Sequence, residues 1–500
     1  MHSDRGADLP HEPAARHPAG GPVPSGPFVG RVSVPGDKSS TQRALLLGAV
    51  AEGRTDVRGA LAAGDTLATA AIVAQLGAGV LWGAAGDGRL SITGVELPRS
   101  EGSVLDCANA GTAARLLLGL LAGYPGRWTL DGDASLRRRP MGRVAQPLRA
   151  MGAEISGDRL PLTLRGAGGA GGAGGAGGAG GAGGAGGAGG AGGARGARGA
   201  RGMRHEVLVP SAQVKSALLL AGLRADGPTT VVQHVPTRDH TERMLARFGV
   251  RVEVEPGEIR VHPGRPRAAV LDIPGDPSSA AFLLVAALLT PGSDVWVTDV
   301  GLWPRRTGFL RALERAGADL MVLRLDGAPA RPAHAPIVLG EMAGTRALPG
   351  AEAGSDPRGD VRAGASELLA FDIAPEDVPD LVDEIPILAL AAARARGTSR
   401  FAGLAELRLK ESDRIAAIAE LLAAFGVPVE AGPDSLAITG VPALRVPSRE
   451  LRFDDHRLAL TAAVACASSG FPLPPMASAD ISFPGFAALL AGCALTRERG

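Results

Sequence analysis

The chain has 500 residues, more than a single hydrophobic core usually holds, so we expect at least two domains. Its 52 basic and 51 acidic residues give a net charge of +1, which argues against a nucleic-acid-binding or membrane-surface protein. Aromatic residues make up only 3%, so the core must consist mainly of Ala, Leu, Val and Ile.

The N-terminal segment lacks the pattern of a folded domain. Residues 1–27 are rich in proline, glycine and histidine and contain no apolar stretch typical of a signal peptide, so we expect a disordered tail. The chain has three cysteines: Cys107, Cys466 and Cys493. Their number and spacing favour neither a disulfide framework nor a metal site. The apolar runs are too short to cross a bilayer, and we expect a cytoplasmic protein.

Six segments begin with small or polar residues and continue as almost wholly apolar helices that end near glycine. They are 39–53, 111–123, 211–223, 278–292, 383–397 and 456–470. Helices that are apolar on all sides must be buried on all sides. An amphipathic helix that ends in glycine before an alternating strand follows each of the first five, and a degenerate copy, FPGFAALLAGCAL, follows the sixth. The pattern predicts six copies of a βαβ-containing α/β unit, and three units per domain would place helices inside and sheets outside.

Two stretches interrupt this repeat. Residues 166–202 consist of Gly-Gly-Ala triplets that end in Ala-Arg-Gly steps, and they have no side chains to bury, so we expect a flexible surface loop. Residues 327–364 are rich in Gly, Pro and Ala and also indicate a loop insertion.

The N-terminal ends of the buried helices carry most of the polar residues of interest. A helix N-terminus offers free N–H groups and the positive end of the dipole, which favour phosphate or carboxylate. Six such ends around one cleft would bind anions strongly. Each fragment alone is also compatible with an ordinary helix cap, a solvated cation or a surface ion pair. Their recurrence at equivalent positions favours a common site.

Nine segments resemble, in order, the motifs of the EPSP synthase family. They are PGDKSSTQRALLLGAVAEG, NAGTAARLLLGLLAG, GDASLRRRPMGRV, SAQVKSALLLAGL, TRDHTERML, GDPSSAAFLL, DEIPILALAAA, LRLKESDR and DHRLAL. The resemblance runs from about residue 28 to 495, apart from the two insertions. It implies an inside-out α/β barrel fold of two similar domains that close on substrates in the cleft between them. Domain one would comprise 28–34 plus 275–500, and domain two 35–274, with the Gly/Ala-rich loop at 166–202.

The resemblance also implies an activity. The family transfers the enolpyruvyl group of phosphoenolpyruvate to the 5-hydroxyl of shikimate 3-phosphate in the pathway to chorismate, with no metal or organic cofactor. The expected partners are therefore these two small molecules, with no nucleic acid and no membrane, and we expect a monomer.

By motif, the resemblance assigns residues to each part of this reaction. The implied shikimate 3-phosphate ligands are Lys38, Ser39, Arg43, Ser211, Ala212, Gln213, Arg238 and Lys410. The implied phosphoenolpyruvate ligands are Lys38, Gly111, Arg139, Arg414 and Arg457, and Asn109 belongs to the same site. Asp383 would accept the proton of the attacking hydroxyl, Glu411 would protonate the methylene carbon, and Lys38 would assist. We expect different surroundings to tune the two carboxylates apart.

The sequence departs from the family pattern at a few positions, and two alternatives stay open. Ala108 and Gln42 replace more usual residues, and ISFPGF (481–486) has no lysine where many relatives place one. The first alternative is the sister UDP-N-acetylglucosamine enolpyruvyl transferase, which uses a reactive cysteine on a mobile loop. None of the three cysteines lies in such a loop. The second is a non-catalytic anion-binding homologue, against which the presence of Asp383 and Glu411 argues.

Overall fold

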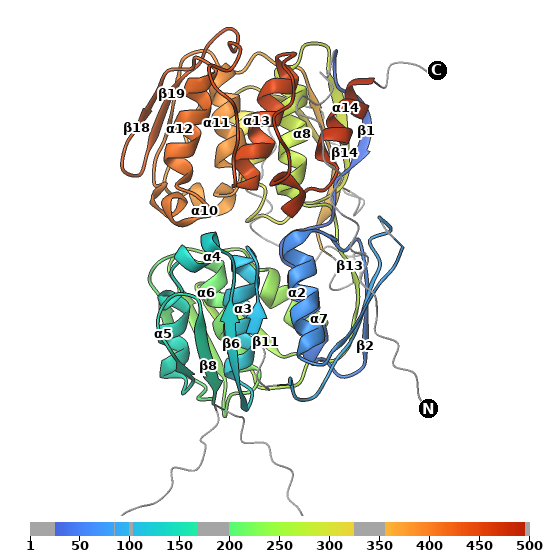
Figure 1. The fold of residues 1–500 in the computed structure, drawn as a ribbon, viewed down its shortest axis with the longest axis vertical. Coiled ribbons are helices and arrows are strands. Elements are labelled where there is room, and N and C mark those ends of the chain that lie inside the picture. Colours follow the sequence, from blue (N-terminus) through green and yellow to red (C-terminus); the bar gives the residue numbers. More distant parts are fainter. Residues whose placement is uncertain (1–25, 85, 100–103, 168–199, 325–355, 496–500) are drawn as a thin grey trace, which may run out of the picture.

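The structure, a computed structural model, describes residues 26–84, 86–99, 104–167, 200–324 and 356–495. They form two halves that lie one above the other (Figure 1). The buried hydrophobic side chains form two separate clusters. One extends from Ala44 to Ile273, and the other contains Phe28, Val34 and residues from Ala280 to Leu490. We propose that the two domains divide where the chain passes between these clusters.

Four sheets share one topology, in which the first two strands are parallel and the remaining pairs are antiparallel. Three of these sheets belong to the lower half, and their strands follow here in their order across each sheet. The first contains β13 (Val270–Asp272), β2 (Arg54–Arg58), β4 (Leu90–Thr93) and β3 (Gly79–Trp82), and the second contains β5 (Val104–Asp106), β6 (Gly126–Asp131), β8 (Leu162–Gly166) and β7 (Glu154–Ile155). The third contains β9 (Arg204–Val207), β10 (Thr229–Gln233), β12 (Glu258–Val261) and β11 (Val252–Glu255). The fourth belongs to the upper half: β1 (Val29–Ser33), β14 (Asp294–Gly301), β16 (Arg358–Gly364), β15 (Asp319–Arg324).

The remaining two units of the upper half are less regular. β17 (Thr398–Phe401), β19 (Leu436–Thr439) and β18 (Val429–Ala431) form a three-stranded sheet, and an isolated parallel bridge from Ile373 to Phe401 occupies the place of a first strand. After β19 the described residues contain helices and no strand. Prolines are frequent at 442–475, and proline cannot donate to a strand ladder.

The predicted buried helices are all present. They are α1 (Lys38–Val50), α3 (Gly111–Ala122), α6 (Ala212–Gly222), α8 (Pro277–Leu289), α11 (Ile385–Arg394) and α13 (His456–Ser468). The helices that alternate with them are α2 (Gly64–Gln75), α5 (Gly142–Ala150), α7 (His240–Arg247), α9 (Gly308–Arg315), α12 (Arg414–Ala424) and α14 (Phe486–Leu495). The last of these, FAALLAGCAL, is apolar rather than amphipathic. Every residue of α8 is buried, as a helix apolar on all sides requires. No described helix has the length and hydrophobicity that a membrane span needs.

The chain passes between the halves twice, through the similar segments VPGD (34–37) and IPGD (273–276). The two segments lie antiparallel, because Asp37 N donates to Pro274 O and Asp276 N donates to Pro35 O, each at 2.9 Å. The strand before each crossing pairs within the half that the chain then leaves. β1 pairs with β14 of the upper half, and β13 pairs with β2 of the lower half. A Cβ on Gly36 would lie 1.7 Å from the carbonyl oxygen of Gly59, so only glycine fits there.

The second predicted insertion was partly wrong. Residues 325–355 lie outside the described residues, but 358–364 form β16, which pairs with strands on both sides. Its sequence, RGDVRAG, has only two apolar side chains besides glycine, Val361 and Ala363, and both are buried in the core. The Arg362 side chain between them is paired with Asp294 at 2.8 Å and Asp319 at 3.0 Å on the neighbouring strands. These cross-strand ion pairs add to the apolar contacts of the strand.

Most of the Gly/Ala-rich segment, 168–199, also lies outside the described residues, but both of its ends belong to the fold. Gly166 is the last residue of β8, and Ala167 N donates to Ala122 O at 2.9 Å. Arg201 N donates to Met151 O at 2.8 Å. A Cβ on Gly152, the next residue, would lie 3.6 Å from the Ala167 Cβ. The two ends therefore lie close together.

We predict that replacing 168–199 by a short Gly-Ser linker leaves the fold intact and stabilises it by no more than about 2 kcal/mol, because the entropy of loop closure falls only slowly with length. The melting temperature of the shortened chain should equal or slightly exceed that of the full chain. A lower melting temperature would show that the segment makes stabilising contacts.

Candidate active site

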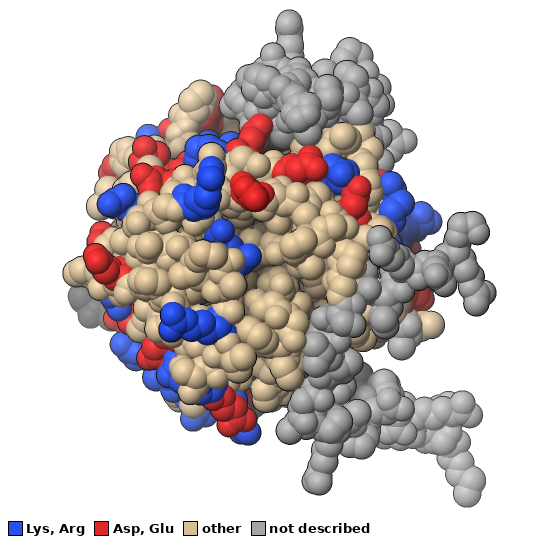
Figure 2. Space-filling model, turned by 90° about the horizontal axis from the view of Figure 1, so that it is seen from above, with Lys and Arg blue, Asp and Glu red and all other residues tan. Residues whose placement is uncertain are grey.

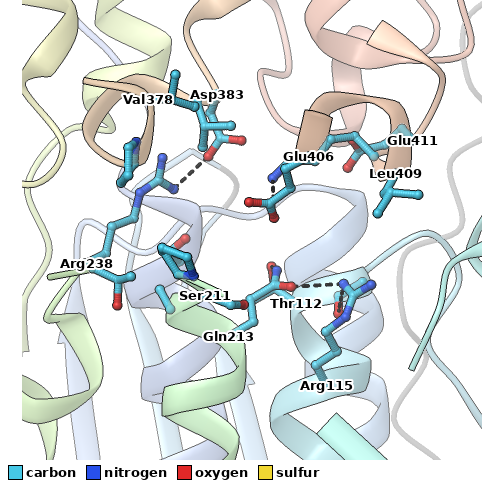
Figure 3. A pocket seen from close by; sticks show the side chains of 18 of the residues that line it. Thr112, Arg115, Ser211, Gln213, Arg238, Val378, Asp383, Glu406, Leu409 and Glu411 are labelled. Atoms are coloured by element: carbon cyan, nitrogen blue, oxygen red, sulfur yellow. Dashed lines mark hydrogen bonds and ion pairs between the residues drawn. The ribbon is translucent and has the colours of Figure 1, made fainter. Parts of the chain in front are cut away.

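A cavity of about 420 Å³ lies between the two halves, at the N-terminal ends of the buried helices. Each of the six helices contributes a lining residue at or just before its start: Lys38, Gly111, Ala212, Asp276, Asp383 and His456. The predicted common cleft is therefore present. Figure 3 shows the lower wall with Gln213, Arg115 and Arg238 facing the upper wall with Asp383 and Glu406.

The cavity concentrates positive charge. Its lining holds ten Lys and Arg residues but five Asp and Glu residues, although the whole chain has a net charge of only +1. On the outer end of the upper half, by contrast, basic and acidic residues lie interspersed (Figure 2). Helix N-termini add further positive potential to the cavity. This arrangement favours ligands with several negative charges.

All the residues predicted for the site line the cavity, with the exception of Asn109. Asn109 lies directly behind the lining, where its Oδ1 accepts a hydrogen bond from Arg139 at 2.6 Å and its Nδ2 donates to Asp133 at 2.7 Å. Asn109 therefore orients Arg139 at the edge of the cavity.

A buried hydrogen-bond network holds Arg43 in the lower wall. Its Nε donates to Thr241 Oγ1 at 2.7 Å, and its other nitrogens donate to Ser216 Oγ at 3.1 Å and Ser39 O at 2.9 Å. Burial lowers the pKa of Arg43 to about 10, which still leaves the guanidinium charged at neutral pH. Lys38, which begins the same helix, pairs with Asp65 at 2.8 Å.

Gly111 makes room for two arginines. A Cβ at this position would lie 2.6 Å from Arg139 Nη1 and 3.2 Å from Arg115 Nη1. Arg115 donates to Gln213 Oε1 at 3.0 Å, while Gln213 Nε2 donates to Thr112 Oγ1 at 2.9 Å. Burial, with repulsion from nearby arginines, lowers the pKa of Arg115 to about 10. The absent side chain thus lets the guanidinium groups approach the start of α3.

Asp383 lies at the start of α11 and pairs with Arg238 of the lower half at 2.6 Å (Figure 3). Burial alone would raise its pKa, but Arg238 and Arg457 outweigh that effect and hold the pKa well below its ordinary value. The neighbouring Glu384 points into the protein, where burial raises its pKa and Ser278 donates a hydrogen bond to it. Only the first of these two acids lines the cavity.

Glu411 lies in the upper wall between two arginines. Arg414 contacts its carboxylate at 2.5 Å and Arg139 of the lower half contacts it at 3.5 Å. Burial would raise the pKa of Glu411, yet Arg414 and Arg139 hold it well below its ordinary value. Arg414 is itself fixed by Asp455, which accepts from its Nε at 2.7 Å. Both candidate catalytic acids therefore have lowered pKa values in this structure.

A third pair crosses the cleft. Arg143 of the lower half lies 3.9 Å from the Glu406 carboxylate, which also contacts Lys410 at 3.5 Å. Three arginines of the lower wall thus face three carboxylates of the upper wall. These carboxylates neutralise cations that an anionic ligand would otherwise meet.

Sequence reasoning missed several lining residues: Asp65, His240, Asp276, Arg306 and Glu406. The sequence does contain a pattern that could have identified Asp276, because this residue ends the second Pro-Gly-Asp segment as Asp37 ends the first. His240 lies within the TRDHTERML motif, whereas Asp65, Arg306 and Glu406 lie in loops or at helix ends that carry no anion-binding pattern. Only long-range packing brings them to the cavity.

The model of the EPSP synthase (3-phosphoshikimate 1-carboxyvinyltransferase) family matches residues 23–173 and 194–490. A relative named 3-phosphoshikimate 1-carboxyvinyltransferase from Thermus thermophilus is 47% identical, over 93% of this chain and 96% of its own. One with the same name from Anaeromyxobacter sp. is 43% identical, over 93% and 96%. The solved EPSP synthase of Acinetobacter baumannii aligns with a TM-score of 0.71 at 33% identity, over 95% of this chain and 97% of that one.

We predict that Asp383→Asn lowers the melting temperature by about 5 °C near neutral pH, because it leaves Arg238 and its neighbours without their counter-charge. A carboxylate with a lowered folded-state pKa stabilises the fold above its ordinary pKa of 3.8 and loses this effect as the pH falls further. The difference from the unaltered chain should therefore shrink towards about pH 3. Asp158→Asn, which removes an exposed ion pair with Arg149, serves as the control. A pH-independent difference would contradict the assignment.

Proposed function

The chain belongs to the EPSP synthase family, and we propose from its cleft which residues carry out the reaction of that family. The enzyme transfers the carboxyvinyl group of phosphoenolpyruvate to the 5-hydroxyl of shikimate 3-phosphate and releases phosphate. This is a step of the shikimate pathway, which leads to chorismate and the aromatic amino acids. The observation that carries the residue proposals is the excess of cations where six helix N-termini meet.

The alternatives are not supported. The curated relatives carry the name 3-phosphoshikimate 1-carboxyvinyltransferase, so they do not support an enzyme that uses UDP-N-acetylglucosamine as the acceptor. Its reactive cysteine has no counterpart among the described thiols, because Cys107 and Cys466 are buried and burial raises the pKa of each to about 12. Two carboxylates within reach of the cleft cations also argue against a purely binding role.

Shikimate 3-phosphate would lie on the lower wall. Ser211, Ala212 and Gln213 open α6, where backbone N–H groups favour a phosphate. Arg238 lies beside them and is paired with Asp383, so an incoming phosphate can take over this arginine. Lys38, Ser39 and Arg43 at the start of α1, with Lys410 from the upper wall, complete the proposed contacts.

Phosphoenolpyruvate would bridge the two walls. Arg414 and Arg457 of the upper half suit its carboxylate, because a guanidinium matches a carboxylate with two parallel hydrogen bonds. Arg139 beside Gly111, together with Lys38, suits its phosphate. Both substrates would then replace the carboxylates that neutralise these cations in the structure.

This exchange of counter-ions prepares the two acids for opposite tasks. When the phosphoenolpyruvate carboxylate binds Arg414, Glu411 loses its main stabilising partner and gains a negative neighbour, and both effects raise its pKa. Glu411 can then hold a proton and deliver it to the methylene carbon. When the shikimate phosphate binds Arg238, Asp383 becomes free to accept the proton of the 5-hydroxyl, whose oxygen attacks the cationic carbon. In the elimination, the methyl group returns a proton to the Glu411 carboxylate and phosphate leaves with the proton held by Asp383, which forms the enol ether.

We also propose that the enzyme acts as a monomer in the cytoplasm. In support, this chain contributes both walls of the cavity and all six helix N-termini that meet there. The buried free thiols Cys107 and Cys466 are compatible with a reducing compartment.

We predict that Asp383→Asn and Glu411→Gln each lower kcat by about 10²- to 10⁴-fold, the usual size of a general acid or base contribution. Shikimate 3-phosphate should still bind, because most of its proposed ligands remain. Phosphate release from the two substrates measures turnover, and calorimetry measures binding. Glu450→Gln, which removes an exposed carboxylate paired with Arg452, is the control. Wild-type rates in either acid variant would refute that residue's role, and an inactive but folded wild-type protein would refute the activity itself.

We predict that Gly111→Ala folds normally but raises KM for phosphoenolpyruvate about tenfold, which corresponds to about 1.4 kcal/mol. The new methyl group would meet the flexible end of Arg139, which can move aside without disturbing the backbone. KM for shikimate 3-phosphate should change little. Equal increases in both KM values would indicate a general distortion of the cleft instead.

A further inference from the structure

A buried arginine lies where the chain passes between the halves. Arg306 belongs to the turn between β14 and α9, and only 2% of its surface is exposed. It lines the inner part of the cavity, yet the proposed reaction gives it no task. An isolated cation in this position would be very unfavourable, so its partners define its role.

Arg306 joins the two crossings of the chain. Its Nη1 donates to Asp37 Oδ2 at 3.1 Å, and its Nη2 donates to Asp276 Oδ1 at 2.8 Å and to Ser278 Oγ at 2.9 Å. Asp37 ends the first Pro-Gly-Asp segment and Asp276 ends the second. One guanidinium therefore holds the equivalent residue of each crossing.

Both aspartates are also helix caps. Asp37 Oδ1 accepts from Ser40 N at 2.6 Å at the start of α1, and Asp276 Oδ1 accepts from Ser278 N at 2.8 Å at the start of α8. In addition, Asp276 Oδ2 accepts from the backbone N of Lys38 at 3.2 Å. The first residue of α1 is thus bonded to an aspartate of the other half, and Arg306 holds that aspartate in place.

The chemistry of this contact requires arginine. The planar guanidinium can donate to two carboxylates at once from different nitrogens, whereas a lysine ammonium is a point charge that cannot reach both in the same geometry. Asp276 and Asp37 together outweigh the effect of burial and raise the pKa of Arg306 above its ordinary value. The cluster is therefore a fixed, charged unit.

We propose that Arg306 is a positioning residue that acts through Lys38: by holding Asp37 and Asp276 it fixes the start of α1 against the upper half and so places the Lys38 ammonium in the cleft. On this proposal, Arg306 acts only through the residues that it holds. This inference rests on the proposed role of Lys38 in substrate binding. A merely structural role would stabilise the crossings without any specific dependence on Lys38.

A double-mutant cycle separates these two roles. Calorimetry measures the Kd of shikimate 3-phosphate for the wild type, Arg306→Gln, Lys38→Ala and the double variant, so inactive proteins can be compared. We expect Arg306→Gln to weaken binding about tenfold in the wild type and less than about twofold in the Lys38→Ala background. Arg305→Gln is the matched control, because the adjacent Arg305 is 41% exposed and pairs with Asp380 outside the cluster. This control should bind normally.

Each other outcome overturns the inference in a recognisable way. Equal weakening by Arg306→Gln in both backgrounds, or none in either, refutes action through Lys38. Normal binding by Lys38→Ala refutes the proposed role of Lys38 and the inference with it. If Arg306→Gln yields too little folded protein, the same cycle with Arg306→Lys keeps the buried charge but not the fork. Arg306→Lys should also weaken binding of shikimate 3-phosphate when Lys38 is present and not in the Lys38→Ala background. An equal loss of affinity in both backgrounds again refutes the proposal.

Discussion

The central constraint on this structure is the need to neutralise cations that are concentrated at helix N-termini. Six lining cations belong to the lower half, together with one lining acid, Asp65, whereas the upper half contributes four of each sign. Charges in a partly buried cleft interact more strongly than on an exposed surface, so the excess positive charge of the lower wall requires counter-charges from the upper wall. The contacts of Asp383, Glu406 and Glu411 with lower-wall arginines meet this need.

The same constraint links binding to chemistry. Carboxylates that serve as counter-ions to arginine must have low pKa values, which suits neither the delivery of a proton nor its removal. In the proposed mechanism, anionic substrates relieve both problems, because they take over the arginines. Glu411 would then be easier to protonate, and Asp383 would be released from Arg238. On this proposal, the acids gain their catalytic properties only when both substrates supply the negative charge that the cleft requires.

The sequence predicted the parts of this arrangement that depend on local pattern. A run such as that of α8 is apolar on all sides and can only be buried, and the polar residues before it must then lie at its end. Strand β16 was missed because it offers only two apolar side chains, Val361 and Ala363, at the end of a Gly-, Pro- and Ala-rich stretch, although both are buried in the core. Arg305 and Arg306 are adjacent and identical, yet one is exposed and the other is buried beside Asp37, 269 positions away. No local pattern distinguishes them.

The two ends of a buried helix differ in function, because the N-terminal end lies at the cleft and the C-terminal end lies away from it. This difference explains where the chain tolerates change. At the N-terminal end of α1, Gly36 leaves no space for even a methyl group, and Asp37 is bonded to both halves. At the C-terminal end of α3, Ala122 O accepts from Ala167, and the Gly/Ala-rich segment departs directly afterwards. The segment therefore leaves the fold at the end of a buried helix that faces away from the cleft. We therefore expect insertions there to leave the distances between the walls unchanged, whereas a change at a crossing would move the start of a helix that carries proposed substrate ligands.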